Sequence, residues 1–295
     1  MKIYELYNIF KINYMDKRLK PTTVRGYVHN YEKYIYPVIG ELHLSQVTYE
    51  KVDELVGFCQ GFGINNTSVV YVLATLSKML SFAVKRGFIT YNVLRSYDYP
   101  KLHKYHYRTI DKVQMSLLLQ VSFGSDCFPA FLLACHYGLR RGECAAVKLS
   151  DFENSILSVN SSRCIIDRKV VETSPKNDRV RRILISHHDE FLLVEWNKNR
   201  DPNREGLLLR RRTGAPISPN VLDKELKKYL QMLQLPALRF HDLRHSYATL
   251  MMSEGVNPKI VSEVLGHSSV DITLDLYSHA NVTMQKACLI VFEDD

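Results

Sequence analysis

Apolar residues recur at helical spacing through the first ninety residues. Segments 3–15, 48–59 and 65–87 carry this pattern, with Thr48 as a possible cap at the start of the second. The third ends in two basic residues and a glycine, which is typical of a helix C-terminus. Segment 20–40 completes the set, with its apolar or aromatic positions at Val24, Tyr27, Val28, Tyr31, Tyr34 and Ile35. The pattern predicts four helices in a small all-helical domain, residues 1–90.

The pattern stops at residues 91–106. This stretch is polar, contains Pro100, and interleaves lysine, histidine and arginine with tyrosine. We expect a linker here, because proline and polar clusters interrupt regular structure. Its basic and aromatic mixture also suits a segment that lies on a phosphate backbone.

Residues 107–295 contain both helical segments and short runs typical of β-strands. Short β-prone runs at 156–160, 162–167, 170–174 and 181–186 lie between helical segments, and a turn at 176–178 separates the last two runs. Asn257, Pro258 and Gly266 fit the cap, the first position and the end of one late helix. The predicted fold is mainly α with a small antiparallel β-sheet. The predicted helical segments are 111–123, 127–147, 219–233, 240–255 and 257–267.

The composition is that of an ordinary globular chain, with one asymmetry. The 295 residues are 46% hydrophobic and carry a net charge of +8. Residues 1–104 hold 14 Lys and Arg against 8 Asp and Glu, a net of +6, whereas the remainder holds 25 against 23, a net of +2. This basic excess favours a polyanion such as nucleic acid, although a merely soluble basic surface gives the same count.

We expect a cytoplasmic protein that does not enter a membrane. No apolar run approaches the roughly 18 residues of a spanning helix, and the N-terminus lacks a signal-peptide pattern. The six cysteines form no C-x-x-C pair, so we expect free thiols and no zinc site.

Two short motifs contain candidate anion-binding residues. In "GLRRGE", residues 138–143, Arg140 and Glu143 are three apart; this spacing fits a surface ion pair, or an arginine held in place for an oxyanion. In "HDLRH", residues 241–245, His241, Arg244 and His245 share one helical face. A zinc site is disfavoured there, because the position after the first histidine is aspartate and the arginine would place a cation beside the metal.

Three further residues are ambiguous when taken singly. His267 follows a predicted helix end, where a histidine can simply bond terminal carbonyls. Lys176 lies in the turn of "SPKNDRVRR", which also fits a solvated basic hairpin. Tyr277 in "LDLYSHA" is one of 18 tyrosines.

The order of these elements resembles the tyrosine recombinase (phage integrase) family. G-L-R-x-G-E, a hairpin lysine, H-x-x-R, G-H and a tyrosine ten residues later cover nearly the whole chain. Two positions depart slightly: Tyr137 replaces a small polar residue, and the hairpin is a variant. The resemblance implies a core-binding domain at 1–90, a linker at 91–106 and a catalytic domain at 107–295.

The resemblance also implies roles. Arg140, Arg244 and His267 would hold the phosphate, with Glu143 supporting Arg140; Tyr277 would be the nucleophile, His241 the base and Lys176 the acid. No cofactor and no metal are implied. The two domains would clamp duplex DNA at specific sites. Candidate phosphate contacts are Lys20, Arg25, Lys78, Lys85 and Arg86.

The expected function is site-specific recombination through a 3′-phosphotyrosyl intermediate, in the integration and excision of a mobile element or phage. A Xer-like chromosome-dimer resolvase, a topoisomerase-like DNA relaxer and a catalytically silent DNA-binding regulator remain alternatives. The family resemblance implies a tetramer on two DNA duplexes, associated with the nucleoid when bound to DNA. The apolar tail run 289–292 is either an edge strand of its own domain or a contact with a neighbouring protomer.

Overall fold

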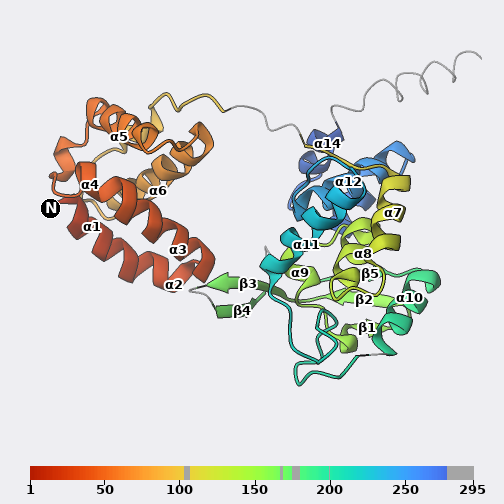
Figure 1. Ribbon diagram of the computed structural model, residues 1–295. Helices are drawn as coiled ribbons and strands as arrows, with labels where there is room; N and C mark the ends of the chain where they lie inside the picture. The colour runs from red at the N-terminus through yellow and green to blue at the C-terminus, as the bar shows by residue number, and fades with distance from the viewer. Residues whose placement is uncertain (103–106, 167–168, 175–179, 199, 278–295) are drawn as a thin grey trace, which may run out of the picture. The chain divides into compact units, whose positions relative to one another are not determined.

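The computed structural model divides the chain into two compact units, Met1–Tyr105 and His106–Asp295 (Figure 1). It describes the chain apart from residues 103–106, 167–168, 175–179, 199 and 278–295, and apart from the side chains of residues 275–277. Lys176 and the tail run 289–292 therefore lie outside the described residues.

The first unit is helical throughout, as the apolar spacing predicts. Two of its helices contain a π turn, η1 (Lys11–Met15) and η2 (Tyr31–Ile35), between α-helical parts. The remaining elements are α1 (Ile3–Phe10), α2 (Asp16–Arg18), α3 (Pro21–Asn30), α4 (Tyr36–Ile39), η3 (Leu44–Gln46), α5 (Tyr49–Gly61), α6 (Asn66–Lys85) and η4 (Val93–Arg95).

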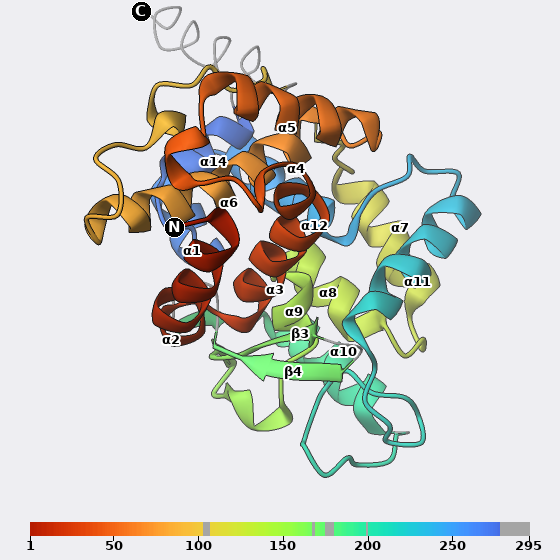
Figure 2. The ribbon, with the colours of Figure 1, turned by 90° about the vertical axis from the view of Figure 1, so that its left-hand side faces the viewer.

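Helix α6 is the core helix of this unit and packs against α1, α3 and α5 (Figures 1 and 2). Asn65 caps it, since the Asn65 side chain accepts a hydrogen bond from the Ser68 amide at 2.9 Å. Its 20 residues are long and apolar enough to span a membrane by length and composition, contrary to our expectation that no run approaches that length. Eight of them are buried inside the unit, which is the packing of a core helix.

Part of the predicted linker packs on the same unit. Asn92 is buried, and its side-chain amide donates to the Ser77 carbonyl and to the Ser81 hydroxyl of α6. Val93 and Leu94 are buried beside it. Residues 92–94 therefore belong to the core of the first unit.

The second unit combines helices with two small antiparallel sheets. Its helices are α7 (Lys112–Ser122), α8 (Phe128–Tyr137), α9 (Arg141–Cys144), α10 (His187–Lys198), α11 (Pro219–Met232), α12 (Phe240–Ser253), α13 (Pro258–Leu265) and α14 (Asp271–Tyr277), with a 3₁₀ turn η5 (Leu149–Asp151). Helix α10 is the one helix of this list, apart from the short α14, that the apolar pattern did not predict.

The strands form one three-stranded sheet and one hairpin. Strand β2 (Ile156–Val159) lies between β1 (Phe152–Glu153) and β5 (Arg181–Leu184), with Leu157 opposite Ile183. Strands β3 (Ser162–Ile166) and β4 (Lys169–Thr173) pair separately, as Figure 2 shows. All four predicted strands are present, in two sheets rather than one.

Helix α8 forms the centre of the second core. Nine of its ten residues are buried, and it packs against α7 and α12. Because α8 is enclosed, its C-terminal end fixes the position of the loop that follows it. That loop carries the first candidate arginine.

Candidate active site

The end of α8 places Arg140. Gly138 caps α8 in the left-handed conformation, with φ of 64°. A Cβ at Gly138 would lie 2.4 Å from Leu265 Cδ2 and 2.7 Å from Tyr247 Cδ1, so only glycine fits. The chain then turns, and Arg140 becomes the N-cap residue of α9.

Glu143 fixes the orientation of Arg140. The Arg140 Nη1 donates to Glu143 Oε1 at 2.9 Å, and the Arg140 amide donates to Glu143 Oε2 at 2.8 Å. Glu143 is 1% exposed. Burial raises the pKa of this carboxyl group, but hydrogen bonds and charge from Arg181, and then from Arg140, lower it to about 2. Glu143 is therefore an anion that holds Arg140 from within the protein.

Arg244 comes to the same place from α12. Its guanidinium is 2% exposed and bridges two helix ends, because Nη1 donates to the Gly138 carbonyl at 2.8 Å and Nη2 to the Leu265 carbonyl at 2.7 Å. Burial, then the charge of Arg140, lowers the pKa of Arg244 to about 9. It remains a cation at neutral pH.

The end of α13 supplies His267. Gly266 ends this helix with φ of 66°, as the sequence predicts, and its carbonyl accepts a hydrogen bond from Arg140 Nη2 at 3.0 Å. His267 Nδ1 lies 2.8 Å from the hydroxyl of the buried Thr273. Burial, then Arg244 and Arg140, lowers the pKa of His267 to about 3, so its ring is neutral at pH 7.

His241 lies one turn before Arg244 on α12. The residue is exposed to solvent. Desolvation, then the charges of Arg244 and Arg140, lowers its pKa to about 4. A neutral imidazole can accept a proton, which is the state that a general base requires.

Of these side chains, Arg140 and His267 border a cavity. A cavity of about 270 Å³ is lined by Arg140, Val180, Arg181, Ser262, Glu263, Gly266 and His267. Helix α14, which ends at Tyr277, packs against α12 and α13. The Tyr277 side chain and Lys176 lie outside the described residues, so their roles remain predictions. The structure does bring together Arg140, Glu143, His241, Arg244 and His267.

The arrangement suits an oxyanion. Two guanidiniums and two neutral imidazoles present hydrogen-bond donors or acceptors, and fixed donors aimed at developing negative charge are usually the largest catalytic effect. Tyr247, three residues after Arg244, is buried with its ring against the Gly138 site, so it packs as expected. Within the described residues no three histidine, cysteine or acidic side chains form a cluster that could hold a metal.

One residue of the site region, Arg181, was misjudged from the sequence. Arg181 appeared as a solvated hairpin arginine, yet its side chain is 10% exposed and pairs with Glu143. The alternation of β5 contained the signal, because Arg181 shares a face with Ile183 while Arg182 faces solvent. Tyr137, the unusual residue before Gly138, donates its hydroxyl hydrogen to Asp189 Oδ2 at 2.6 Å.

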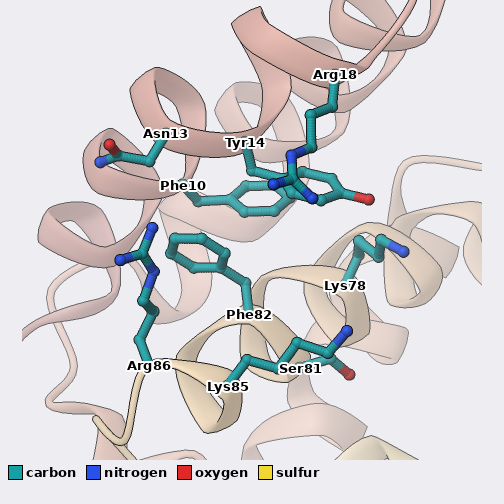
Figure 3. A pocket seen from close by; sticks show the side chains of 9 residues that line it. All are labelled: Phe10, Asn13, Tyr14, Arg18, Lys78, Ser81, Phe82, Lys85 and Arg86. Carbon is teal, nitrogen blue, oxygen red and sulfur yellow. The ribbon is translucent and has the colours of Figure 1, made fainter.

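The basic candidates of the first unit divide into two groups. Lys20 is the N-cap residue of α3 and Arg25 lies within that helix, and both have interactions of their own. Lys78, Lys85 and Arg86 line a cavity of about 200 Å³ between η1 and α6. Figure 3 shows the rings of Phe10 and Tyr14 on one side of it and the ring of Phe82 on the side of these cations. The other residues that line it are Asn13, Arg18 and Ser81.

Comparison with known proteins decides the family. A model of the phage integrase family matches residues 108–284, and a model of the phage integrase N-terminal SAM-like domain matches residues 2–56. The chain belongs to the phage integrase family. It is a tyrosine recombinase, an enzyme that cleaves and rejoins DNA.

Its relatives include an integrase and a XerC recombinase. The recombinase is 26% identical to the ICEBs1 integrase of Bacillus subtilis strain 168, over 90% of this chain and 76% of that protein. It is 25% identical to the tyrosine recombinase XerC of Haemophilus influenzae strain PittEE, over 90% of this chain and 89% of that protein.

Solved structures confirm the fold. The recombinase matches the Tn1549 transposon integrase in complex with a circular intermediate DNA with a TM-score of 0.83, at 18% identity, over 98% of this chain and 99% of that one. It matches residues 75–356 of lambda integrase, in a dimer bound to a COC′ core site, with a TM-score of 0.73, at 16% identity, over 96% and 97%.

Proposed function

We propose that this recombinase acts at specific sites in duplex DNA through a 3′-phosphotyrosyl intermediate. One observation carries the proposal: Arg140, Arg244 and two neutral histidines meet at the packed ends of α8, α12 and α13, beside the helix that ends in Tyr277. Such a set of groups suits one phosphodiester, and the helix beside it ends in a tyrosine, the type of nucleophile that such a link requires.

The chemistry follows from the charge that develops on the phosphate. Arg140 and Arg244 bind the non-bridging oxygens, and His267 donates a further hydrogen bond. The Tyr277 oxygen attacks phosphorus, its proton passes to His241, and the bond from phosphorus to the 5′-oxygen breaks. Lys176 gives that oxygen its proton. The phosphotyrosyl bond conserves the energy of the broken linkage, so a 5′-hydroxyl can reverse the step without ATP.

The biological role that we propose is integration and excision of a mobile element, and the likeness to the ICEBs1 integrase and to the Tn1549 transposon integrase supports it. A Xer-like resolvase is the second candidate, because XerC matches over 89% of its length and the ICEBs1 integrase over 76%. A lambda integrase tetramer bound to a Holliday junction, with a TM-score of 0.72, supports the further proposal of a tetramer on two duplexes.

Trapping of the covalent intermediate tests the chemistry. The cognate duplex is first selected from a random-sequence library by binding to the full chain. A nick beside the scissile phosphate then lets the 5′-hydroxyl fragment diffuse away, so the adduct accumulates. We expect a covalent adduct with the native chain and with Tyr247→Phe, and none with Tyr277→Phe.

Two results would overturn this assignment. An adduct that persists in Tyr277→Phe would place the nucleophile elsewhere, and strong inhibition by a chelator would require a metal. If the native chain binds the selected DNA without any adduct, the silent regulator is the correct interpretation.

A plasmid assay separates the roles. Two selected sites in direct repeat should yield excised circles when the enzyme pairs them, whereas a topoisomerase-like relaxer would remove supercoils and leave both sites in place. Deletion of the gene distinguishes the two recombinases. An integrase is required for excision of its element, and a Xer-like resolvase for separation of chromosome dimers.

A further inference from the structure

Three consecutive carbonyl groups at the end of α13 each accept a hydrogen bond from a different arginine. Arg244 donates to Leu265 at 2.7 Å and Arg140 to Gly266 at 3.0 Å. The third, Arg181, donates from Nε to the Val264 carbonyl at 2.7 Å. The last carbonyls of a helix lack partners within it and form its negative end, so they attract cations. Arg181 thus sits in the same row as the two phosphate-binding candidates.

Arg181 also holds Glu143 by both carboxylate oxygens. Its Nη1 lies 3.0 Å from Oε1 and its Nη2 2.8 Å from Oε2, the two-pronged geometry in which an arginine restrains a carboxylate most firmly. The same two oxygens accept the side chain and the amide of Arg140. One buried carboxylate therefore joins β5 to the N-cap of α9.

The surroundings keep Arg181 in this position. A Cβ at Gly266 would approach its Cδ, Nη1 and Nε atoms within 3.2–3.4 Å, so the glycine leaves room for the guanidinium. All three guanidinium nitrogens already donate to protein oxygens. Arg181 also borders the cavity beside Arg140 and His267, and these three bonds hold Glu143 and the end of α13 in place.

We propose that Arg181 is a positioning residue of the recombinase: it fixes Glu143 and the end of α13, and through them the direction in which Arg140 points at the scissile phosphate. The inference rests on the proposed function, because it assigns Arg140 to that phosphate.

The physical reason is competition for Glu143. Without Arg181, both carboxylate oxygens would be available to Arg140 alone, and a buried anion attracts its remaining cation strongly. The Arg140 guanidinium would then turn toward Glu143 and away from the cavity. The Val264 carbonyl would lose its donor as well, which loosens the helix end that Arg140 and Arg244 share.

Strand β5 provides a matched control. Arg182 adjoins Arg181, carries the same charge, and points to the solvent-exposed face of the strand. An Arg182→Met variant removes one positive charge from the same strand without touching Glu143. Any difference between Arg181→Met and Arg182→Met therefore comes from the place of the arginine in the fold, because both variants lose the same charge.

The test is the rate of covalent adduct formation on the nicked selected duplex, measured against DNA concentration. We expect Arg181→Met to lower the rate at saturating DNA about 10- to 100-fold and to leave the half-saturating concentration within two-fold, as loss of a residue supporting a catalytic group does. Arg181→Lys should recover part of the rate, because it restores the charge but not the two-pronged geometry. Arg182→Met should match the native chain in both quantities.

A double variant shows whether Arg181 acts through Arg140. In an Arg140→Lys background, Arg181→Met should lower the rate of adduct formation at saturating DNA less than three-fold, because the group that Arg181 positions is already gone. A full, multiplicative loss in that background would overturn the proposal, and so would a native rate in Arg181→Met. If Arg181→Met does not fold, Arg181→Lys carries the same comparison. A native chain that forms no adduct would instead overturn the proposed function.

Discussion

At the scale of single residues, His245 is the most exceptional side chain. It is 7% exposed, and neither ring nitrogen has a hydrogen-bond partner within the described residues. Its ring lies edge-on to His241, with centroids 4.6 Å apart, and 4.1 Å from the Tyr107 ring. Burial, then the neighbouring His241, lowers the pKa of His245 to about 4 despite the nearby Asp242. The protein thus encloses a neutral imidazole.

This histidine should make the second unit sensitive to acid. The unfolded chain binds the proton near pH 6.5 and the folded chain near 4, so stability falls as pH decreases between these values. From pH 7 to pH 5 the part of this loss that comes from His245 is about 2 kcal/mol. His241 and His267, whose pKa values are also lowered, contribute to the total as well. We expect His245→Leu to remove the part that comes from His245, measured by urea unfolding with Trp196 fluorescence, the single tryptophan of the chain.

His187 is the control for that measurement, because its side chain is 95% exposed. His187→Leu should leave the difference between pH 7 and pH 5 unchanged. An equal difference in the native chain and in His245→Leu would contradict the assignment of this loss to His245.

Sequence alone predicted the residues that belong to short motifs. Arg140, Glu143, His241, Arg244 and His267 do lie together, because each motif stands at a helix end or on one helical face. Arg181 escaped notice because its partner, Glu143, is far away in the sequence and only the fold joins them.

At the scale of elements, the junction of α8 and α9 is the most constrained. We expect Gly138→Ala to destabilise the second unit by about 2–4 kcal/mol, since it adds both left-handed strain and contacts below 3 Å with Leu265 and Tyr247. Urea unfolding followed through Trp196 measures this cost.

Gly206 is a control that separates backbone strain from close contacts. Its φ of 67° nearly equals that of Gly138, but a Cβ there would have open space around it. Gly206→Ala should therefore cost only about 1 kcal/mol, the strain alone. Equal costs for the two variants would show that crowding at Gly138 is unimportant.

Element prediction succeeded where capping residues mark the ends. Asn257, Pro258 and Gly266 define α13 correctly. Helix α10 was missed because its buried side includes Asp189, an acidic residue, beside Leu193 and Trp196. The Asp189 carboxylate is stabilised there by His136 and Tyr137 of α8, and no local pattern reveals partners of that kind.

At the scale of the whole molecule, the uneven charge should govern affinity for DNA. No ion pair within the described residues joins Arg18, Lys78, Lys85 or Arg86, the cations of the η1–α6 cavity, to a carboxylate. Lys2 and Lys51 of the same unit, by contrast, pair with Glu41 and Glu54. A cluster of unpaired cations over aromatic rings attracts phosphate, and each such contact releases counterions.

We therefore expect Lys78→Met/Arg86→Met to bind the selected duplex more weakly and with a salt dependence shallower by about two counterions. Titrations at several salt concentrations measure this slope. Lys2→Met/Lys51→Met removes the same charge from the paired lysines and should change the slope much less. Identical slopes for the two variants would remove the cavity from the DNA contacts.

The overall architecture was predictable because the apolar spacing, the capping residues and the distribution of charge indicate the same division of the chain into two parts. The predicted mainly helical fold with antiparallel strands is confirmed. The π turns were not predictable, since the apolar spacing of segments 3–15 and 20–40 also fits a plain α-helix. The split of the strands into two sheets depends on pairing partners that no run of residues specifies.

The π turn η1 sets the chain's tolerance to insertion and deletion. A π turn closes over one residue more than an α turn, so η1 contains one surplus residue in its helix. Removing one residue from η1 would restore a plain α-helix and leave the residues on either side in register. Arg18, after the turn, and Phe10, before it, would therefore both keep their places at the cavity that they share with Lys78. A deletion within α1 has no wide turn to absorb it, so it would rotate one part of the helix against the other by about 100°. The helix therefore tolerates the loss of a residue at η1 better than in α1.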